Sequence, residues 1–248
     1  MTHTRELLPT TTGAERTLGP SRETVLRMCG AALAIGGPLC IAGGTIHPIV
    51  DGKGHSVEAL TSPGTPLAQS LLGIGTVALI LGLPGLYAWM RPRLGTAGFI
   101  GLVCYLVGNI TTATGHLTIE LFVAQRLASD PATAHLIADN DNMIGSTAFL
   151  IFNQGGGLVM LTGMGLLGAS MLRNDTVPRW IAVLTLIGMV AFFLPMPAVQ
   201  HLTGFIWEAP RGIAVAALGI LMLRHPGGLR RWAEPLRGAA APARVPAA

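Results

Sequence analysis

His116 and Glu120 lie four residues apart in the stretch TTATGHLTIELFVAQRLASD, which interrupts one of the most apolar parts of the chain. Residues four apart share one face of a helix, so we expect the two side chains to meet. A carboxylic acid beside an imidazole can donate a proton to a substrate and recover it. The pair therefore predicts general acid catalysis, with Glu120 as the acid and His116 as the group that sets its protonation state or returns the proton.

Other polar and aromatic residues fall at a comparable depth in neighbouring apolar segments. Ionisable groups in such segments usually face the interior of a helix bundle or a wet cavity. We add Glu208 to the catalytic candidates. The candidate substrate-binding residues, chosen for an aromatic face or an amide, are Phe122, Asn153, Gln154 and Trp207. The aromatic faces could stabilise a developing cation. This chemistry requires no metal or cofactor, and we predict neither.

The composition defines the environment of these residues. Half of the 248 residues are hydrophobic, 11% are charged, and the mean hydropathy is +0.57. Soluble domains carry about 25% charged residues, so this composition is typical of a membrane protein. The formal net charge is +4, but the charges lie between and beyond the apolar runs, which argues against a nucleic-acid-binding surface.

Six apolar runs are long enough to cross about 30 Å of hydrocarbon, which takes roughly 20 helical residues. They are approximately 28–50, 66–90, 95–122, 143–172, 180–200 and 204–223. The runs are continuous and do not alternate, which favours helices over barrel strands. We predict an all-α integral membrane protein of six transmembrane helices. Residues 1–27 form a polar arm, residues 28–223 the bundle, and residues 224–248 a basic tail rich in Ala and Pro.

The basic residues predict the orientation. Thirteen of the 16 Lys and Arg residues fall on one side if the chain crosses six times, leaving Lys53, Arg126 and Arg211 on the other. By the positive-inside rule, both termini are then cytoplasmic. Because the last run is short, its helix must begin earlier and draw Glu208 and Arg211 into the outer interface. These two residues are three apart and are expected to pair.

With this orientation, each outward-running helix carries a histidine near its outer end: His47, His116 and His201. They could supply two axial ligands to haem or three ligands to zinc, which is the alternative to acid catalysis. The chain has no CxxCH or HExxH motif to support this alternative. His55 and His135 are interpreted as ordinary loop residues. A third alternative is a non-catalytic sensor or transporter.

The segments GLPGLYAWMRPRLGTAGFIGLVCYLVG and LRNDTVPRWIAVLTLIGMV, together with His47–Pro48 at the end of the first run, resemble small multi-pass actinobacterial membrane proteins of mostly unassigned function. The resemblance spans most of the chain from Met28 to Leu223. In size, hydropathy and scattered intramembrane carboxylates, the chain is also similar to membrane-embedded terpene cyclases. No catalytic motif matches residue by residue, so the resemblance assigns no functional residue.

Together these observations favour a membrane-embedded enzyme of the bacterial cell membrane. It would act on an isoprenoid-like or lipid-like substrate by acid-initiated cyclisation or isomerisation. Its expected partners are the lipid bilayer and an apolar small molecule, without nucleic acid, and a homo-oligomer is compatible with the composition.

Overall fold

The computed structural model describes residues 19–138, 142–175, 177–194 and 198–228, and these are helical with short connections and without strands. The body consists of six helical segments, counting the two arms of the kinked helix α3 separately. The helices are α1 (Arg22–Ile46), α3 (Thr65–Thr111), α5 (Thr147–Arg173), α6 (Arg179–Ala191) and α7 (Leu202–Arg224). Short elements lie at one end: α2 (Val57–Leu60), η1 (Thr112–Leu117), η2 (Glu120–Ala124), α4 (Gln125–Ser129) and η3 (Ala134–Leu136).

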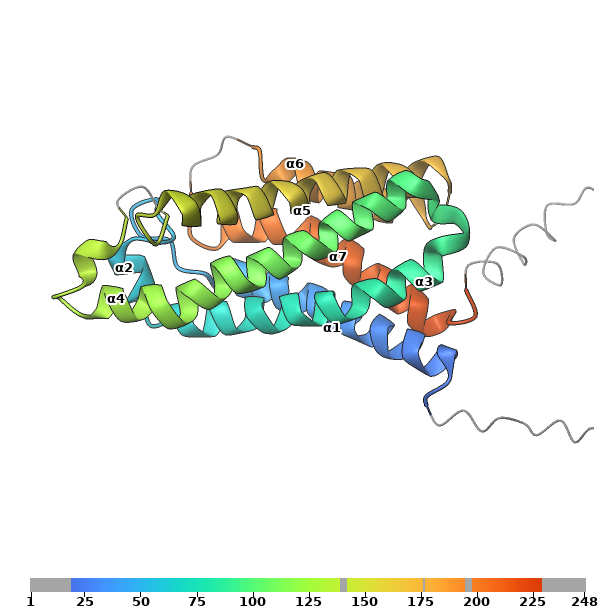
Figure 1. Ribbon diagram of the computed structural model, residues 1–248, viewed down its shortest axis with the longest axis horizontal. Helices are drawn as coiled ribbons and strands as arrows, with labels where there is room; N and C mark the ends of the chain where they lie inside the picture. The colour runs from blue at the N-terminus through green and yellow to red at the C-terminus, as the bar shows by residue number, and fades with distance from the viewer. Residues whose placement is uncertain (1–18, 139–141, 176, 195–197, 229–248) are drawn as a thin grey trace, which may run out of the picture.

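Helix α3 doubles back on itself at Gly95. The φ of Gly95 is +68°, a backbone conformation that residues with a Cβ rarely adopt. Figure 1 shows the first arm running the length of the molecule, turning, and returning as the second arm. The predicted runs 66–90 and 95–122 are therefore two antiparallel arms, and the arginine-flanked turn signal between them is confirmed.

The helices pack as a closed bundle in which α1 contacts α7 and α3, α5 contacts α3 and α6, and α6 contacts α7. Glycine permits the closest of these approaches. A Cβ at Gly204 of α7 would overlap the backbone of Gly44 on α1, and a Cβ at Gly37 would overlap Gly212. Close approach at small residues is typical of helices packed in lipid. The hydrophobic effect does not drive helices together there, so association depends on close van der Waals packing.

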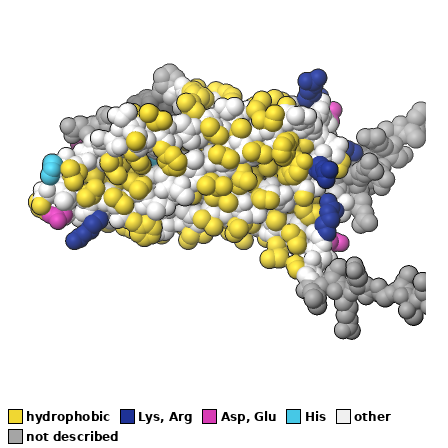
Figure 2. Space-filling model, in the orientation of Figure 1, with side chains coloured by type: hydrophobic (Ala, Val, Ile, Leu, Met, Phe, Trp, Pro, Cys, Tyr) yellow, Lys and Arg dark blue, Asp and Glu magenta, His cyan; other side chains and the backbone are white. Residues whose placement is uncertain are grey.

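Four helical segments of the described residues are long and apolar enough to cross a membrane: 22–46, 65–129, 147–173 and 202–224. Large apolar side chains such as Ile35, Leu81, Ile151 and Ile187 are exposed, and Figure 2 shows hydrophobic side chains spread over the face of the bundle between its two ends. Helix α6 has only 13 residues and ends at Ala191, so the predicted run 180–200 is a helix over its first part only.

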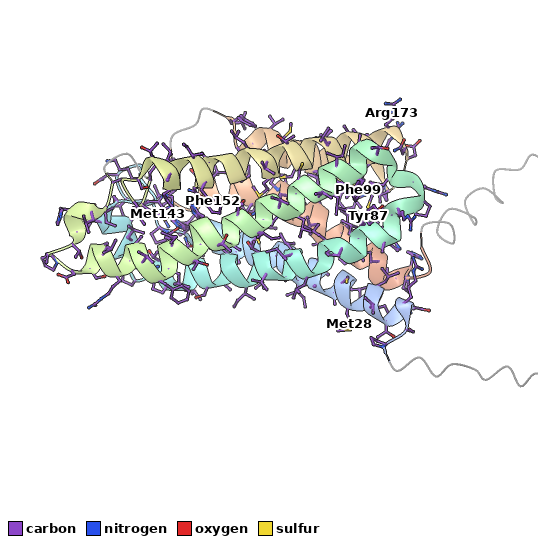
Figure 3. All side chains as sticks on the ribbon, in the orientation of Figure 1. Met28, Tyr87, Phe99, Met143, Phe152 and Arg173 are labelled. Atoms are coloured by element: carbon purple, nitrogen blue, oxygen red, sulfur yellow. The ribbon has the colours of Figure 1, made fainter. Side chains whose placement is uncertain are left out.

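One end of the bundle is basic. There Arg22 donates to the carbonyl of Ala88, Trp89 donates to the carbonyl of His225, and Asn174 donates to the carbonyl of Leu94. These contacts bring together the start of α1, the turn within α3 and the ends of α5 and α7. Arginine side chains gather at this end in Figure 2, and Figure 3 labels Arg173 there.

The opposite end carries the short elements and a small apolar core of their own. Leu60 of α2 packs with Ala124, Ala128, Ile137 and Met143. This cluster fixes the α1–α2 connection against the end of the long α3 segment. Met143 and Phe152, labelled in Figure 3, lie in this half of the molecule. The ionisable residues singled out in the sequence meet here.

Candidate metal centre

A tight hairpin at the end of α1 brings two histidines together. Asp51 and Gly52 both have positive φ, and Val50 and Lys53 exchange two backbone hydrogen bonds of 2.9 Å. Asp-Gly is a favoured pair for a two-residue turn of this kind. The chain therefore folds back so that the rings of His47 and His55 lie 5.8 Å apart, edge to face.

The other two residues of the site lie where the long α3 segment changes its helical geometry. The backbone N–H of Thr118 donates to the carbonyl of Ala113, and that of Gln125 donates to Glu120, each five residues back. Such π-helical turns are rare and often mark functional sites. The helix continues through His116 and Glu120, and the prediction that the two share a face is confirmed, because His116 Nε2 lies 3.4 Å from Glu120 Oε2.

Three imidazoles converge on the Glu120 carboxylate, whose residue is 0% exposed. His47 Nε2 lies 2.9 Å from Oε1, and His55 Nε2 lies 3.4 Å from Oε2, the same oxygen that His116 approaches. Among the described residues, Oε2 makes no hydrogen bond that meets normal geometry. A buried carboxylate oxygen without such a bond is costly, so this atom requires a further partner.

The contact of His47 Nδ1 shows which nitrogen of this ring carries a proton. Its Nδ1 lies 3.0 Å from the carbonyl oxygen of Pro48. A carbonyl can only accept, so Nδ1 carries the proton and donates. Nε2 then faces Glu120 either with a second proton or with a lone pair. Histidines that ligate a metal commonly use a backbone carbonyl in this way to present the other nitrogen as a ligand.

The separations at the carboxylate match a coordination shell. Ligand atoms at about 2.0–2.1 Å from a tetrahedral ion are roughly 3.3 Å apart, and His55 Nε2 lies 3.4 Å from Glu120 Oε2. The ligand atoms of His47, His55 and Glu120 all lie within 4.8 Å of one another. The 2.9 Å pair of His47 and Glu120 has to open by only a few tenths of an ångström to admit an ion.

His116 connects this cluster to α5. The Asn153 amide lies 3.4 Å from His116 Nδ1, and the rings of His116 and His55 lie 5.0 Å apart. Asn153 therefore orients the third imidazole. The ligand atoms that lie close enough together to hold one ion belong to His47, His55 and Glu120, so His116 lies beside the candidate ligand group.

A cavity of about 510 Å³ opens beside the cluster. His47, His55 and His116 line it, whereas Glu120 does not. The carboxylate of Glu120 thus lies behind the three histidines, which separate it from the cavity. An ion held by these nitrogens would be reached from the cavity.

The structure distributes the predicted site residues over this cavity. Asn153, Gln154 and Trp207 line it, as does Glu208 at a deeper level. Phe122 does not line it and is 69% exposed on the outside of the bundle. Glu208 is paired with Arg211, as the spacing predicted, and both side chains are buried among the helices.

The predicted histidine trio needs a correction. His201 is exposed and its Nδ1 lies 2.9 Å from the carbonyl oxygen of Thr45, away from the carboxylate. His55, interpreted from the sequence as an ordinary loop residue, takes its place. The Asp-Gly turn was the signal that could have found it. His47 and His116 contact the same carboxylate, whereas the two axial ligands of a haem lie on opposite faces of the ring.

Comparisons of the chain with protein-family models, with curated proteins and with solved structures give no significant match.

The hairpin yields a test of how His55 is positioned. Gly52 has a φ of +78°, and a Cβ added there would meet no atom within 4 Å, so Gly52→Ala adds strain without a clash. We expect this change to loosen the turn and to weaken metal binding several-fold, measured by competition with a fluorescent zinc chelator. Gly73→Ala, at a helical glycine with open space, is the control. Equal affinity in both variants would contradict the positioning role of the turn.

Proposed function

We propose that this chain is a multi-pass protein of the bacterial cell membrane that binds one divalent transition-metal ion at the end of an internal cavity. His47, His55 and Glu120 are the proposed ligands, and His116 lies beside them. The observation that carries the proposal is the convergence of three imidazole nitrogens on one buried carboxylate. This replaces our expectation from sequence that the site needs no metal.

The donor set suits zinc: two histidines and one glutamate are an established zinc ligand set, which Fe²⁺ shares. Imidazole and carboxylate at near-tetrahedral separations suit Zn²⁺, whereas Mg²⁺ and Ca²⁺ prefer oxygen ligands and Cu(I) prefers sulfur. Three protein ligands facing a cavity are typical of catalytic zinc, and four of structural zinc. The cavity beside the histidines supports the catalytic arrangement.

We infer six crossings with both termini in the cytoplasm. The two arms of α3 and the short α6 would join α1, α5 and α7 as spans. The described arginines at the ends of these helices gather at one end, while Lys53 and Arg126 lie at the end with the metal centre. By the positive-inside rule, the metal centre then lies near the outer face.

The reaction class we propose is metal-assisted chemistry on an apolar substrate. Bound zinc would supply a Lewis acid that polarises an oxygen of the substrate or activates water. Around it, the histidines hold the ion, Glu120 offsets its charge, and the apolar lining excludes bulk water. Acid-initiated cyclisation by Glu120 has less support, because the carboxylate lies behind the histidines and does not line the cavity.

The test is metal analysis of the detergent-purified full chain, prepared with an affinity tag that contains no histidine. We expect about one zinc ion per chain in the wild type. His47→Ala should lose it, because the variant removes a ligand whose orientation the Pro48 carbonyl fixes. His135→Ala, at an exposed position of η3, should retain it. Metal-free wild-type protein that also fails to take up added zinc would overturn the proposal, as would equal zinc in both variants.

A further inference from the structure

We propose that the cavity binds an uncharged acyl amphiphile, such as a fatty ester or amide, and that Trp207 and Arg211 donate hydrogen bonds to its polar group. This inference rests on the proposed metal centre and names the substrate class of the same cavity. It is carried by two cavity-lining residues of α7: the indole N–H of Trp207, which has no acceptor among the described residues, and one N–H group of Arg211, which faces only a thioether.

The two donors lie on one face of α7. Trp207 and Arg211 are four residues apart, and both line the cavity. Residues at this spacing stack one above the other along a helix. The cavity is therefore lined both by the histidines of the candidate metal centre and by these two residues of α7.

Trp207 offers a fixed donor. Its ring is stacked on Phe192, with centroids 5.6 Å apart and planes inclined by 16°. Its indole Nε1 is buried and has no hydrogen-bond partner within the described part of the chain. An indole nitrogen can only donate, and buried indoles usually find an acceptor. A ligand oxygen in the cavity would supply one.

Arg211 offers a second donor that is held by a weak acceptor. Its Nε donates to Glu208 Oε2 over 3.0 Å, and its Nη2 donates to the same oxygen. Its Nη1 instead faces the sulfur of Met160 at 3.3 Å. A thioether is a poor acceptor, so a ligand oxygen would displace it.

The charges select the kind of oxygen. Glu208 is paired with Arg211, so the two together carry no net charge. A strongly charged group such as a phosphate would face the Glu208 carboxylate without a compensating cation from this pair. A carbonyl oxygen needs only the donors. The pair therefore favours an acyl group over a phosphate headgroup.

The remaining lining suits the chain of such a molecule. Leu72, Leu158, Leu161 and Phe193 contribute apolar surface to the cavity. A volume of about 510 Å³ lies within the range of pockets that hold small organic ligands. Glu208 packs against Gly44 on α1, and His47 follows about one helical turn later, near 4.5 Å along the axis. Trp207, Arg211 and the three histidines all line this one cavity.

The experiment measures binding of radiolabelled methyl laurate to the full chain in nanodiscs, with empty nanodiscs subtracted and labelled dodecane as the chain-only probe. We expect saturable binding of methyl laurate to the wild type. Trp207→Phe keeps an aromatic ring against Phe192 but removes the N–H, so we expect affinity for methyl laurate to fall about 3- to 10-fold. Dodecane binding should not change.

The matched control is Trp180→Phe, at an exposed position of α6, which should bind methyl laurate as the wild type does. Wild-type affinity in Trp207→Phe, an equal loss for dodecane, or no saturable binding would overturn the inference. Repeating the measurement after chelator treatment separates the two proposals. Trp207-dependent binding in a protein that takes up no zinc would refute the metal centre alone, whereas zinc uptake without methyl laurate binding would refute the acyl ligand alone.

Discussion

Glu120→Gln is expected to abolish stoichiometric zinc binding, with a loss of affinity of at least about 100-fold. The amide keeps the shape of the side chain but removes the negative charge on which three imidazoles converge. Loss of an outer-shell partner alone costs roughly 10- to 100-fold, so loss of a charged ligand should exceed that range. Zinc titration followed by metal analysis measures the effect directly. Zinc should also raise the unfolding temperature of the wild type and not that of the variant.

The control is Glu58→Gln, which removes a carboxylate at an exposed position of α2 close in sequence to the site. This variant should bind zinc as the wild type does. If Glu120→Gln retains full zinc binding, Glu120 is not a ligand. If that variant also loses an acid-dependent activity, the acid-initiated reaction expected from the sequence would regain support.

The sequence predicted the helices well where apolar runs end at strong turn signals. The RPRLG segment marked the turn within α3, because Gly95 takes a conformation that other residues disfavour. It predicted less well where a run continues past the helix. The fifth run extends to about residue 200, whereas α6 ends at Ala191. Apolar composition indicates where a chain can be buried and does not by itself define where helical hydrogen bonding stops.

Half of the candidate metal centre followed from spacing. His116 and Glu120 meet because a helix connects them, and no tertiary information is needed. His47 and His55 reach the carboxylate from another part of the chain, through a hairpin whose direction depends on packing against the end of α3. Three histidines on alternate helices suggested a site with His201, but the hairpin places His55 closer. Side-chain convergence between loops is set by tertiary packing, which periodicity cannot show.

The second large effect concerns Arg211. Arg211→Met is expected to destabilise the protein by about 3–5 kcal/mol, because the variant leaves the Glu208 carboxylate buried without its cation. Methionine fills much of the same volume, so the cost arises from the unpaired charge and not from a cavity. The measurement is the free energy of unfolding in mixed micelles with increasing denaturing detergent.

The double variant Glu208→Gln, Arg211→Met isolates the cause. Glutamine retains the size of Glu208 and removes its charge, so we expect the double variant to recover most of the lost stability, since replacing both members of a buried ion pair is often nearly neutral. A double variant as unstable as Arg211→Met alone would contradict this account. In that case packing of the Arg211 side chain, and not charge pairing, would hold α7 in the bundle. Arg211 is also one of the two proposed donors to the ligand. We therefore expect the double variant to fold but to bind methyl laurate more weakly than the wild type does. The two measurements separate the contribution of Arg211 to stability from its contribution to ligand affinity.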